Sequence, residues 1–170
     1  MIRISTAVKF AAVASVLLLA ACTDKPKAVE TAPPPTSMSS TTTSSIVPGS
    51  AEDLRVNVGD TVHFDYDAYN ITEEGKSVLQ RQAAWLQKYP SVRVTVEGHC
   101  DERGTREYNL ALGARRANSV KEYLVSLGVS AGRLDTISYG KERPICTESD
   151  ESCWAQNRRG VTTITGGASS

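Results

Sequence analysis

The sequence predicts one domain of the α/β class, an α+β sandwich in which helices pack on one side of a mixed sheet. Short apolar alternations typical of half-buried strands occur at residues 54–58, 62–67, 92–96, 134–139 and 161–164. Two longer stretches with helical periodicity separate them, one before Pro90 and one at residues 105–127. This strand–helix–strand order, repeated and closed by a final strand, predicts the sandwich.

The N-terminal residues 1–21 have the form of a secretory signal. Arg3 and Lys9 precede an apolar run that is too short to span a bilayer comfortably. The run ends at Leu-Ala-Ala-Cys22, which resembles a lipobox and predicts that Cys22 becomes the acylated first residue of the mature protein. The alternatives are an ordinary signal cleaved after Ala-x-Ala or an uncleaved anchor. Thr23 stands where an aspartate favours the inner membrane, so we expect a lipid-anchored outer-membrane protein whose domain faces the periplasm.

Residues 22–50 are expected to be the acylated cysteine and a disordered linker. The stretch from Thr23 onward is rich in Pro, Ser, Thr and Ala and has hardly a large apolar side chain. Such a segment buries too little surface to offset its ordering entropy. As a relaxed coil it spans roughly 30 Å, so the globular domain, residues 51–170, can search space below its anchor.

The charge balance argues against a nucleic-acid partner. The chain has 19 basic and 19 acidic residues, and removal of the signal takes away two basic ones, leaving 17 against 19. A nucleic-acid-binding domain needs a clustered basic face, which this balance does not favour.

Capping residues define the first expected helix. Thr72 is a plausible N-cap, and the acidic Glu73 and Glu74 suit the positive end of the helix dipole. An apolar face then runs through Val78, Leu79, Ala83 and Leu86. His63, in the strand before it, is expected on the solvent-facing side.

The second expected helix follows a polar loop, residues 98–104, at the end of the strand 92–96. Gly128 is expected to cap this helix, and Gly113 in its interior, which costs about 1 kcal/mol against alanine, indicates close packing of the backbone on the sheet. Asn109, Leu112 and Arg116 share one stripe of the helix, which adjoins an apolar stripe. The apolar stripe consists of Leu110, Gly113, Ala117, Val120, Leu124 and Leu127.

Asp101 in the loop and Arg116 on the helix form a candidate binding pair. A guanidinium grips a carboxylate through two parallel hydrogen bonds, and a carboxylate complements an ammonium. Together they could hold a ligand that carries both groups, as an amino acid does. The alternative is a simple ion pair between the loop and the helix.

These residues carry a resemblance to a known family. The motifs are Gly98-His99-Cys100-Asp101-Glu102-Arg103-Gly104-Thr105, Tyr108-Asn109-Leu110-Ala111-Leu112, Arg115-Arg116-Ala117 and Ser138-Tyr139-Gly140. The chain resembles the OmpA-like peptidoglycan-binding domain over roughly residues 54–164. Within that family it is most similar to the lipoprotein members of the Tol-Pal system.

The resemblance implies a peptidoglycan-binding cleft. Asp101 and Arg116 would hold the ammonium and carboxylate of diaminopimelate in the stem peptides. The cleft would also be formed by Arg103, Leu112, Tyr66, Asp67 and Tyr69. The alternatives are that Arg103 only shapes the loop and that the aromatic residues form a turn with one buried tyrosine. Arg115 is rotated by about 100° from Arg116 and is interpreted as a solvated charge, and Asn157-Arg158-Arg159 as structural.

The resemblance also implies partners. It predicts binding to TolB and other Tol-Pal components, exchange between TolB and the wall, and a role in envelope constriction at division. An OmpA-like lipoprotein outside the Tol-Pal system, acting as a wall anchor or stator, is the alternative. No stretch of the sequence decides between them.

No enzyme, metal or cofactor is expected. The chain has no Gly-x-Ser-x-Gly elbow and no phosphate-binding loop. The adjacent residues His99 to Glu102 point in different directions, and no second His or Cys pair has zinc spacing.

The cysteines depart from the family pattern. Cys100 replaces the alanine or threonine common in the motif, and Cys146 and Cys153 lie seven residues apart in a polar insert. In an oxidising periplasm the last two are disulfide candidates. Cys100 is then expected to be free and shielded under the start of the helix.

Overall fold

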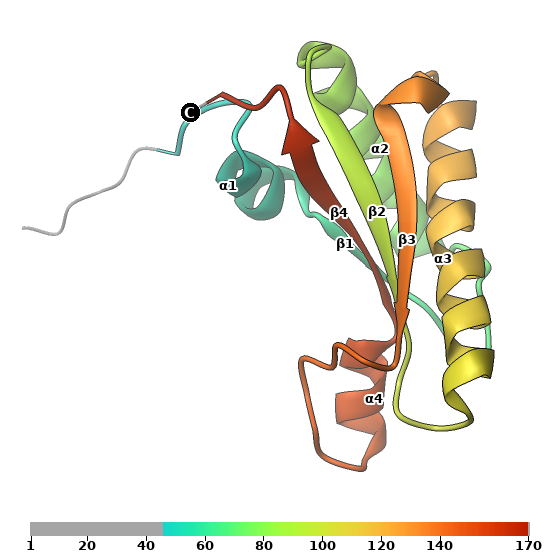
Figure 1. The fold of residues 1–170 in the computed structure, drawn as a ribbon. Helices are drawn as coiled ribbons and strands as arrows, with labels where there is room; N and C mark the ends of the chain where they lie inside the picture. The colour runs from blue at the N-terminus through green and yellow to red at the C-terminus, as the bar shows by residue number, and fades with distance from the viewer. Residues whose placement is uncertain (1–45, 170) are drawn as a thin grey trace, which may run out of the picture. The chain divides into compact units, whose positions relative to one another are not determined.

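The computed structural model of the chain describes residues 46–169, which form a four-stranded sheet with two long helices on one face (Figure 1). The strands are β1 (Thr61–His63), β2 (Arg93–His99), β3 (Leu134–Gly140) and β4 (Arg159–Gly166). Their order is β1-β4-β2-β3, with β2 parallel to β3 and antiparallel to β4, and β1 antiparallel to β4. The predicted mixed α+β sandwich is confirmed.

The helices are two long ones and several short turns. They are α1 (Ala51–Asp53), η1 (Leu54–Val58, a π-helix), α2 (Glu73–Lys88), α3 (Arg106–Ser126), η2 (Ala131–Arg133, a 3₁₀-helix) and α4 (Glu151–Asn157). The core joins α2 and α3 to the inner face of the sheet through side chains such as Leu79, Leu86, Val94, Val96 and Val120. Across residues 46–169, none of these helices combines the length and the apolar character needed to cross a bilayer.

The expected strand at residues 54–58 is wrong, because this segment is helical. The Ser50 hydroxyl accepts a hydrogen bond from the Asp53 amide and starts α1, which continues as η1 until Gly59, at φ 91°. The Asp53 carboxylate also accepts hydrogen bonds from the Asn57 amide group and the Trp85 indole. These contacts fix the helical turns, although the apolar residues alternate along the sequence.

The expected strand at residues 62–67 is shorter than predicted. β1 ends at His63, which is exposed as expected, and Phe64 is buried. The chain then turns, and Asp67 has a φ of 52°, in the left-handed region that non-glycine residues seldom adopt.

Both long helices begin at the threonines that their sequences suggest. The Thr72 hydroxyl accepts a hydrogen bond from the Gly75 amide, and Thr105 caps α3 in the same way through Tyr108. Gly128, at φ 94°, follows the end of α3 as predicted.

Two glycines let α3 approach β2. A Cβ atom built on Gly98 would lie 1.8 Å from the Gly113 carbonyl oxygen, so neither strand nor helix has room for a side chain here. The predicted close packing at Gly113 is therefore confirmed. The predicted apolar stripe fails at Leu110, which is 45 % exposed because its turn packs its backbone against the edge strand β3 at Gly140.

The polar insert between β3 and β4 contains an unpredicted helix, α4. The Asp150 side chain caps it by accepting from the Cys153 amide, and a disulfide joins Cys153 to Cys146. The buried Asn157 side chain accepts a hydrogen bond from the Cys146 amide and donates one to the Cys146 carbonyl. The insert is thereby held as a compact unit against the end of the sheet.

Candidate functional site

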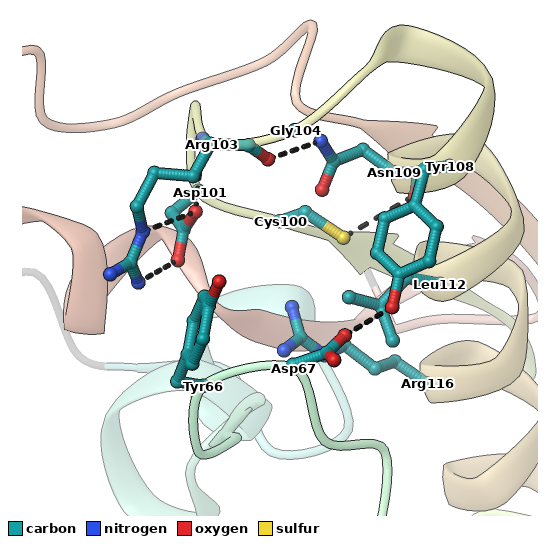
Figure 2. Close-up of a pocket in the computed structure, with 10 residues that line it drawn as sticks. All are labelled: Tyr66, Asp67, Cys100, Asp101, Arg103, Gly104, Tyr108, Asn109, Leu112 and Arg116. Atoms are coloured by element: carbon teal, nitrogen blue, oxygen red, sulfur yellow. Dashed lines mark hydrogen bonds and ion pairs between the residues drawn. The ribbon is translucent and has the colours of Figure 1, made fainter.

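A pocket of about 200 Å³ lies where β2 ends and α3 begins (Figure 2). Its lining consists of Tyr66, Asp67, Cys100, Asp101, Arg103, Gly104, Tyr108, Asn109, Leu112 and Arg116. Six of the seven residues predicted for a cleft therefore meet in one place. Tyr69 does not line the pocket; it is exposed, and the Arg115 guanidinium lies 5.5 Å from its ring centre.

The loop that carries the pocket is fixed at both ends. The Cys100 amide donates to the Gly140 carbonyl at 2.8 Å, which continues the β2–β3 pairing by one residue. The Asn109 side chain, from the first turns of α3, donates to the carbonyls of Arg103 and Thr105. Gly104, at φ 85°, makes the turn between them. The loop is thus held in a defined conformation on the helix that supplies the other half of the pocket.

Asp101 is buried and surrounded by arginines. It accepts from the backbone amide and Nε of Arg103 at 3.1 Å each, and from Arg103 Nη2 at 2.6 Å. Arg158 Nη1 lies 3.5 Å from the same carboxylate. Burial alone would raise the pKa of Asp101, but the hydrogen bonds and charge of Arg103, aided by Arg158, outweigh it and lower the pKa below its usual value.

Arg116 is fully buried at the inner side of the pocket and has no ion pair within residues 46–169. It donates to three backbone carbonyls: Ala68 from Nε at 2.8 Å, His99 from Nη1 at 2.9 Å and Asp65 from Nη2 at 3.1 Å. Burial lowers its pKa, but an arginine stays protonated. The alternative of an Asp101–Arg116 ion pair is therefore wrong for this structure, since each residue has other partners.

Arg116 also keeps hydrogen-bonding capacity in reserve. A guanidinium has five N–H groups, and the three contacts use one on each nitrogen. One N–H on Nη1 and one on Nη2 remain, which is the pair of donors that an incoming carboxylate could accept from.

Aromatic side chains form the outer rim of the pocket. Tyr66 is 63 % exposed, and the Arg103 guanidinium lies 4.2 Å from its ring centre. Tyr108 donates its hydroxyl hydrogen to the Asp67 carboxylate, which joins α3 to the loop after β1 (Figure 2). Leu112 is buried and gives the pocket an apolar wall. The rim can thus contact both apolar and polar parts of a ligand.

Cys100 lies under the start of α3 as a small buried side chain. Its thiol donates to the Asn109 carbonyl at 3.3 Å, and burial raises its pKa although the charge of Arg116 opposes this. It is the free cysteine among the described residues. It lines the pocket as a small buried side chain.

Sequence reasoning missed the support that α4 gives to the site. Arg158 donates to the Phe64 carbonyl and to Glu151, in addition to its contact with Asp101. The Trp154 ring centre lies 4.0 Å from the Arg103 guanidinium, and its indole donates to Glu102 at 3.0 Å. The sequence gives one signal for this support. Arg158 belongs to the stretch Asn157-Arg158-Arg159, for which the resemblance implies a structural role.

The described residues hold no cluster of three or more His, Cys, Asp or Glu side chains suited to a metal ion. The pocket instead combines a buried cation with reserve donors, a buried carboxylate and an aromatic rim. These features suit a small polar ligand with charged groups of both signs.

Residues 63–158, more than half of the chain, match the OmpA family. The chain belongs to the OmpA family. Several of its curated relatives share one name. A "Peptidoglycan-associated lipoprotein" of Rhizobium meliloti (strain 1021) is 51% identical over 154 residues, covering 91% of this chain and 85% of the relative. One from Agrobacterium fabrum (strain C58) is 57% identical over 122 residues, covering 72% of this chain and 69% of that relative.

Solved structures agree with this assignment. The peptidoglycan-associated lipoprotein from Burkholderia pseudomallei matches with a TM-score of 0.61 and 40% identity, over 62% of this chain and 90% of that one. The C-terminal domain of Helicobacter pylori MotB matches with a TM-score of 0.59 and 26% identity, over 63% of this chain and 84% of that one. The curated relatives are named for association with peptidoglycan and not for a reaction.

Proposed function

We propose that the chain is an outer-membrane lipoprotein that binds peptidoglycan non-covalently and links the outer membrane to the cell wall. The names of the relatives support the coarse function, and the pocket at the end of β2 supports a specific ligand group. That group is the side-chain end of diaminopimelate, where an ammonium and a carboxylate share one carbon atom.

The observation that carries this proposal is the state of Arg116. A buried guanidinium without an acidic partner in the described domain is costly unless something compensates it. Three carbonyl oxygens do so in part, and the two remaining N–H groups match the two oxygens of a carboxylate. In the proposed complex Arg116 binds the diaminopimelate carboxylate and Asp101 the ammonium, while Tyr66, Asp67 and Leu112 surround the rest. Arg103 borders the ammonium subsite through its contacts with Asp101. Tyr69 would contact only a longer ligand.

Titration with a soluble stem peptide tests the site without the avidity of a whole wall, which offers many ligand copies near a tethered domain. We expect Asp101→Asn and Arg116→Ala to weaken binding by about ten- to a hundredfold, because each leaves one ligand charge without its hydrogen bonds. Amidation of the diaminopimelate carboxylate should weaken binding to the wild type and matter less to Arg116→Ala. Unchanged affinities in variants whose melting curves match the wild type would remove both residues from the site.

Anchoring through Cys22 is part of the proposal, and that residue lies outside the described range. So do the proposed signal, residues 1–21, and most of the proposed linker, residues 22–50. Cells fed labelled palmitate should incorporate it into the wild type and not into Cys22→Ser, which should be unprocessed or soluble. Label in Cys22→Ser that fractionates with the outer membrane would contradict the lipobox.

Membership of the Tol-Pal system is the finer part of the proposal. It predicts binding to TolB and other Tol-Pal components and a role in constriction of the envelope at cell division. The similarity to MotB keeps an anchor outside that system as the alternative. Retention of TolB by the purified protein supports the first possibility, and failure to retain TolB together with intact wall binding supports the second.

A further inference from the structure

The Asp101 carboxylate has no acceptor site left for a ligand. An ionised carboxylate offers about four lone-pair positions. In the structure Oδ1 accepts from the backbone amide and Nε of Arg103, and Oδ2 accepts from Arg103 Nη2 and faces Arg158 Nη1. A ligand ammonium can bind Asp101 only if one of these donors leaves. The structure also indicates which donor that is.

Arg158 is fixed in place. Its side chain is 7 % exposed, and it donates to the Phe64 carbonyl at 3.0 Å and to Glu151 at 2.6 Å in addition to facing Asp101. Its distance of 3.5 Å from Asp101 is also the longest of the four contacts. Moving Arg158 would break two further hydrogen bonds and gain little room at the carboxylate.

The Arg103 side chain, in contrast, has a second place to go. It is 30 % exposed, and its Nη1 lies 3.9 Å from Oε2 of Glu151, a second carboxylate. The Tyr66 and Trp154 rings lie 4.2 Å and 4.0 Å from its guanidinium, so the same aromatic contacts can accompany a small shift. Two acids and two rings therefore surround one partly exposed cation (Figure 2 shows the Asp101 and Tyr66 side).

We propose that Arg103 occupies the ammonium subsite of the free protein and determines which ligands gain entry to it. This inference rests on the proposed function. When a ligand binds, its ammonium replaces the Arg103 side chain at Asp101, and the guanidinium moves to Glu151. The Arg103 backbone amide and Arg158 keep the Asp101 carboxylate in position during the exchange. No covalent bond changes, and the charge in the pocket stays balanced.

This exchange makes the site selective for a ligand with both charges on one carbon. A simple amine must displace Arg103 without any other contact and so binds poorly. A ligand whose carboxylate is already held by Arg116 presents its ammonium beside Asp101 at a high effective concentration, and it can therefore displace a tethered competitor. Acylation of the amine, as in a cross-linked stem, removes the replacement charge and leaves Arg103 in place.

The test is a calorimetric titration of the full chain, purified in detergent, with stem peptide that has a free or an acetylated diaminopimelate side-chain amine. Arg103→Gln removes the competing cation, so we expect the free-amine peptide to bind about tenfold more tightly than to the wild type. The acetylated peptide should bind both proteins equally. Glu151→Gln removes the second acid, so it should weaken binding in the wild type and have no effect on the Arg103→Gln background. Arg103→Lys, which keeps the charge, serves as the matched control.

The outcomes separate two failures. Binding by the wild type with weaker or unchanged binding by Arg103→Gln refutes this inference alone, because Arg103 then contacts the ligand or takes no part. An effect of Glu151→Gln that persists in the Arg103→Gln background also refutes it, since Glu151 would act through Arg158. Absence of binding to the wild type and the variants refutes the proposed function, and this inference with it.

Discussion

Gly98→Ala tests whether the contact between β2 and α3 holds the pocket together. The added Cβ would lie 1.8 Å from the Gly113 carbonyl oxygen and 2.6 Å from its carbon, whereas ordinary contacts begin at 3.4 Å. The obstacle is the backbone of a 21-residue helix, which cannot rotate away as a side chain can. The helix must therefore move by more than 1 Å, and overpacking of this kind costs about 1–3 kcal/mol or more.

The functional consequence follows from the position of the contact. Gly98 lies three residues before Asp101, and Gly113 three before Arg116, so the displacement separates the two halves of the pocket. We expect urea unfolding of Gly98→Ala to show a loss of about 3 kcal/mol and the stem-peptide affinity to fall at temperatures where the variant is folded. Gly132→Ala is the control, because the nearest atom to its Cβ is 4.0 Å away. A change below about 0.5 kcal/mol in Gly98→Ala would refute the reasoning.

Two further predictions concern the thiols and the buried imidazole. Alkylation of the unfolded, unreduced protein followed by mass spectrometry should label Cys100 and neither Cys146 nor Cys153, and a bridge to Cys100 would contradict the structure. Burial, aided by the charges of Arg159 and Arg143, lowers the pKa of His99 to about 4, although Glu97 lies 3.5 Å from its Nε2. The unfolded chain therefore binds a proton between pH 6.5 and 4 that the folded one does not, and stability should fall by up to about 3 kcal/mol as pH drops through that window. His99→Phe, which replaces two nitrogens that lack hydrogen-bond partners, should lose much of this slope in pH-dependent denaturation, and an unchanged slope would refute the assignment.

The sequence was informative where local rules and tertiary packing agree. Both helix starts have threonine caps with acidic first turns, and the strand before the loop alternates over one buried face. The helical spacing of Asn109, Leu112 and Arg116 predicted one shared stripe of the helix, and in the structure all three are buried and line the pocket. Asp101 lies in the same pocket because β2, the strand before its loop, ends beside the start of α3.

The sequence was uninformative where distant contacts decide. Residues 54–58 form a helix because Asp53 bonds Trp85, which is 32 residues away, and no local pattern shows that contact. The helix α4 has seven residues and depends on its cap and its disulfide, so its periodicity is too short to detect. Tyr69 follows a turn in which Asp67 has a left-handed backbone conformation, and that conformation is not readable from the residue type.

The three arginines of the site differ in role because they differ in partners. Arg158 is bound to a carbonyl and two carboxylates, so its charge is already paired with acids and it fixes the geometry of the site. Arg103 pairs with Asp101, lies 3.9 Å from Glu151 and is partly exposed, so its guanidinium can move from one acid to the other. Arg116 donates to three backbone carbonyl oxygens and has no acidic partner among the described residues, so its charge is not neutralised. An anion that enters the pocket therefore gains most at Arg116, and the ammonium that accompanies it must then compete with Arg103 for Asp101.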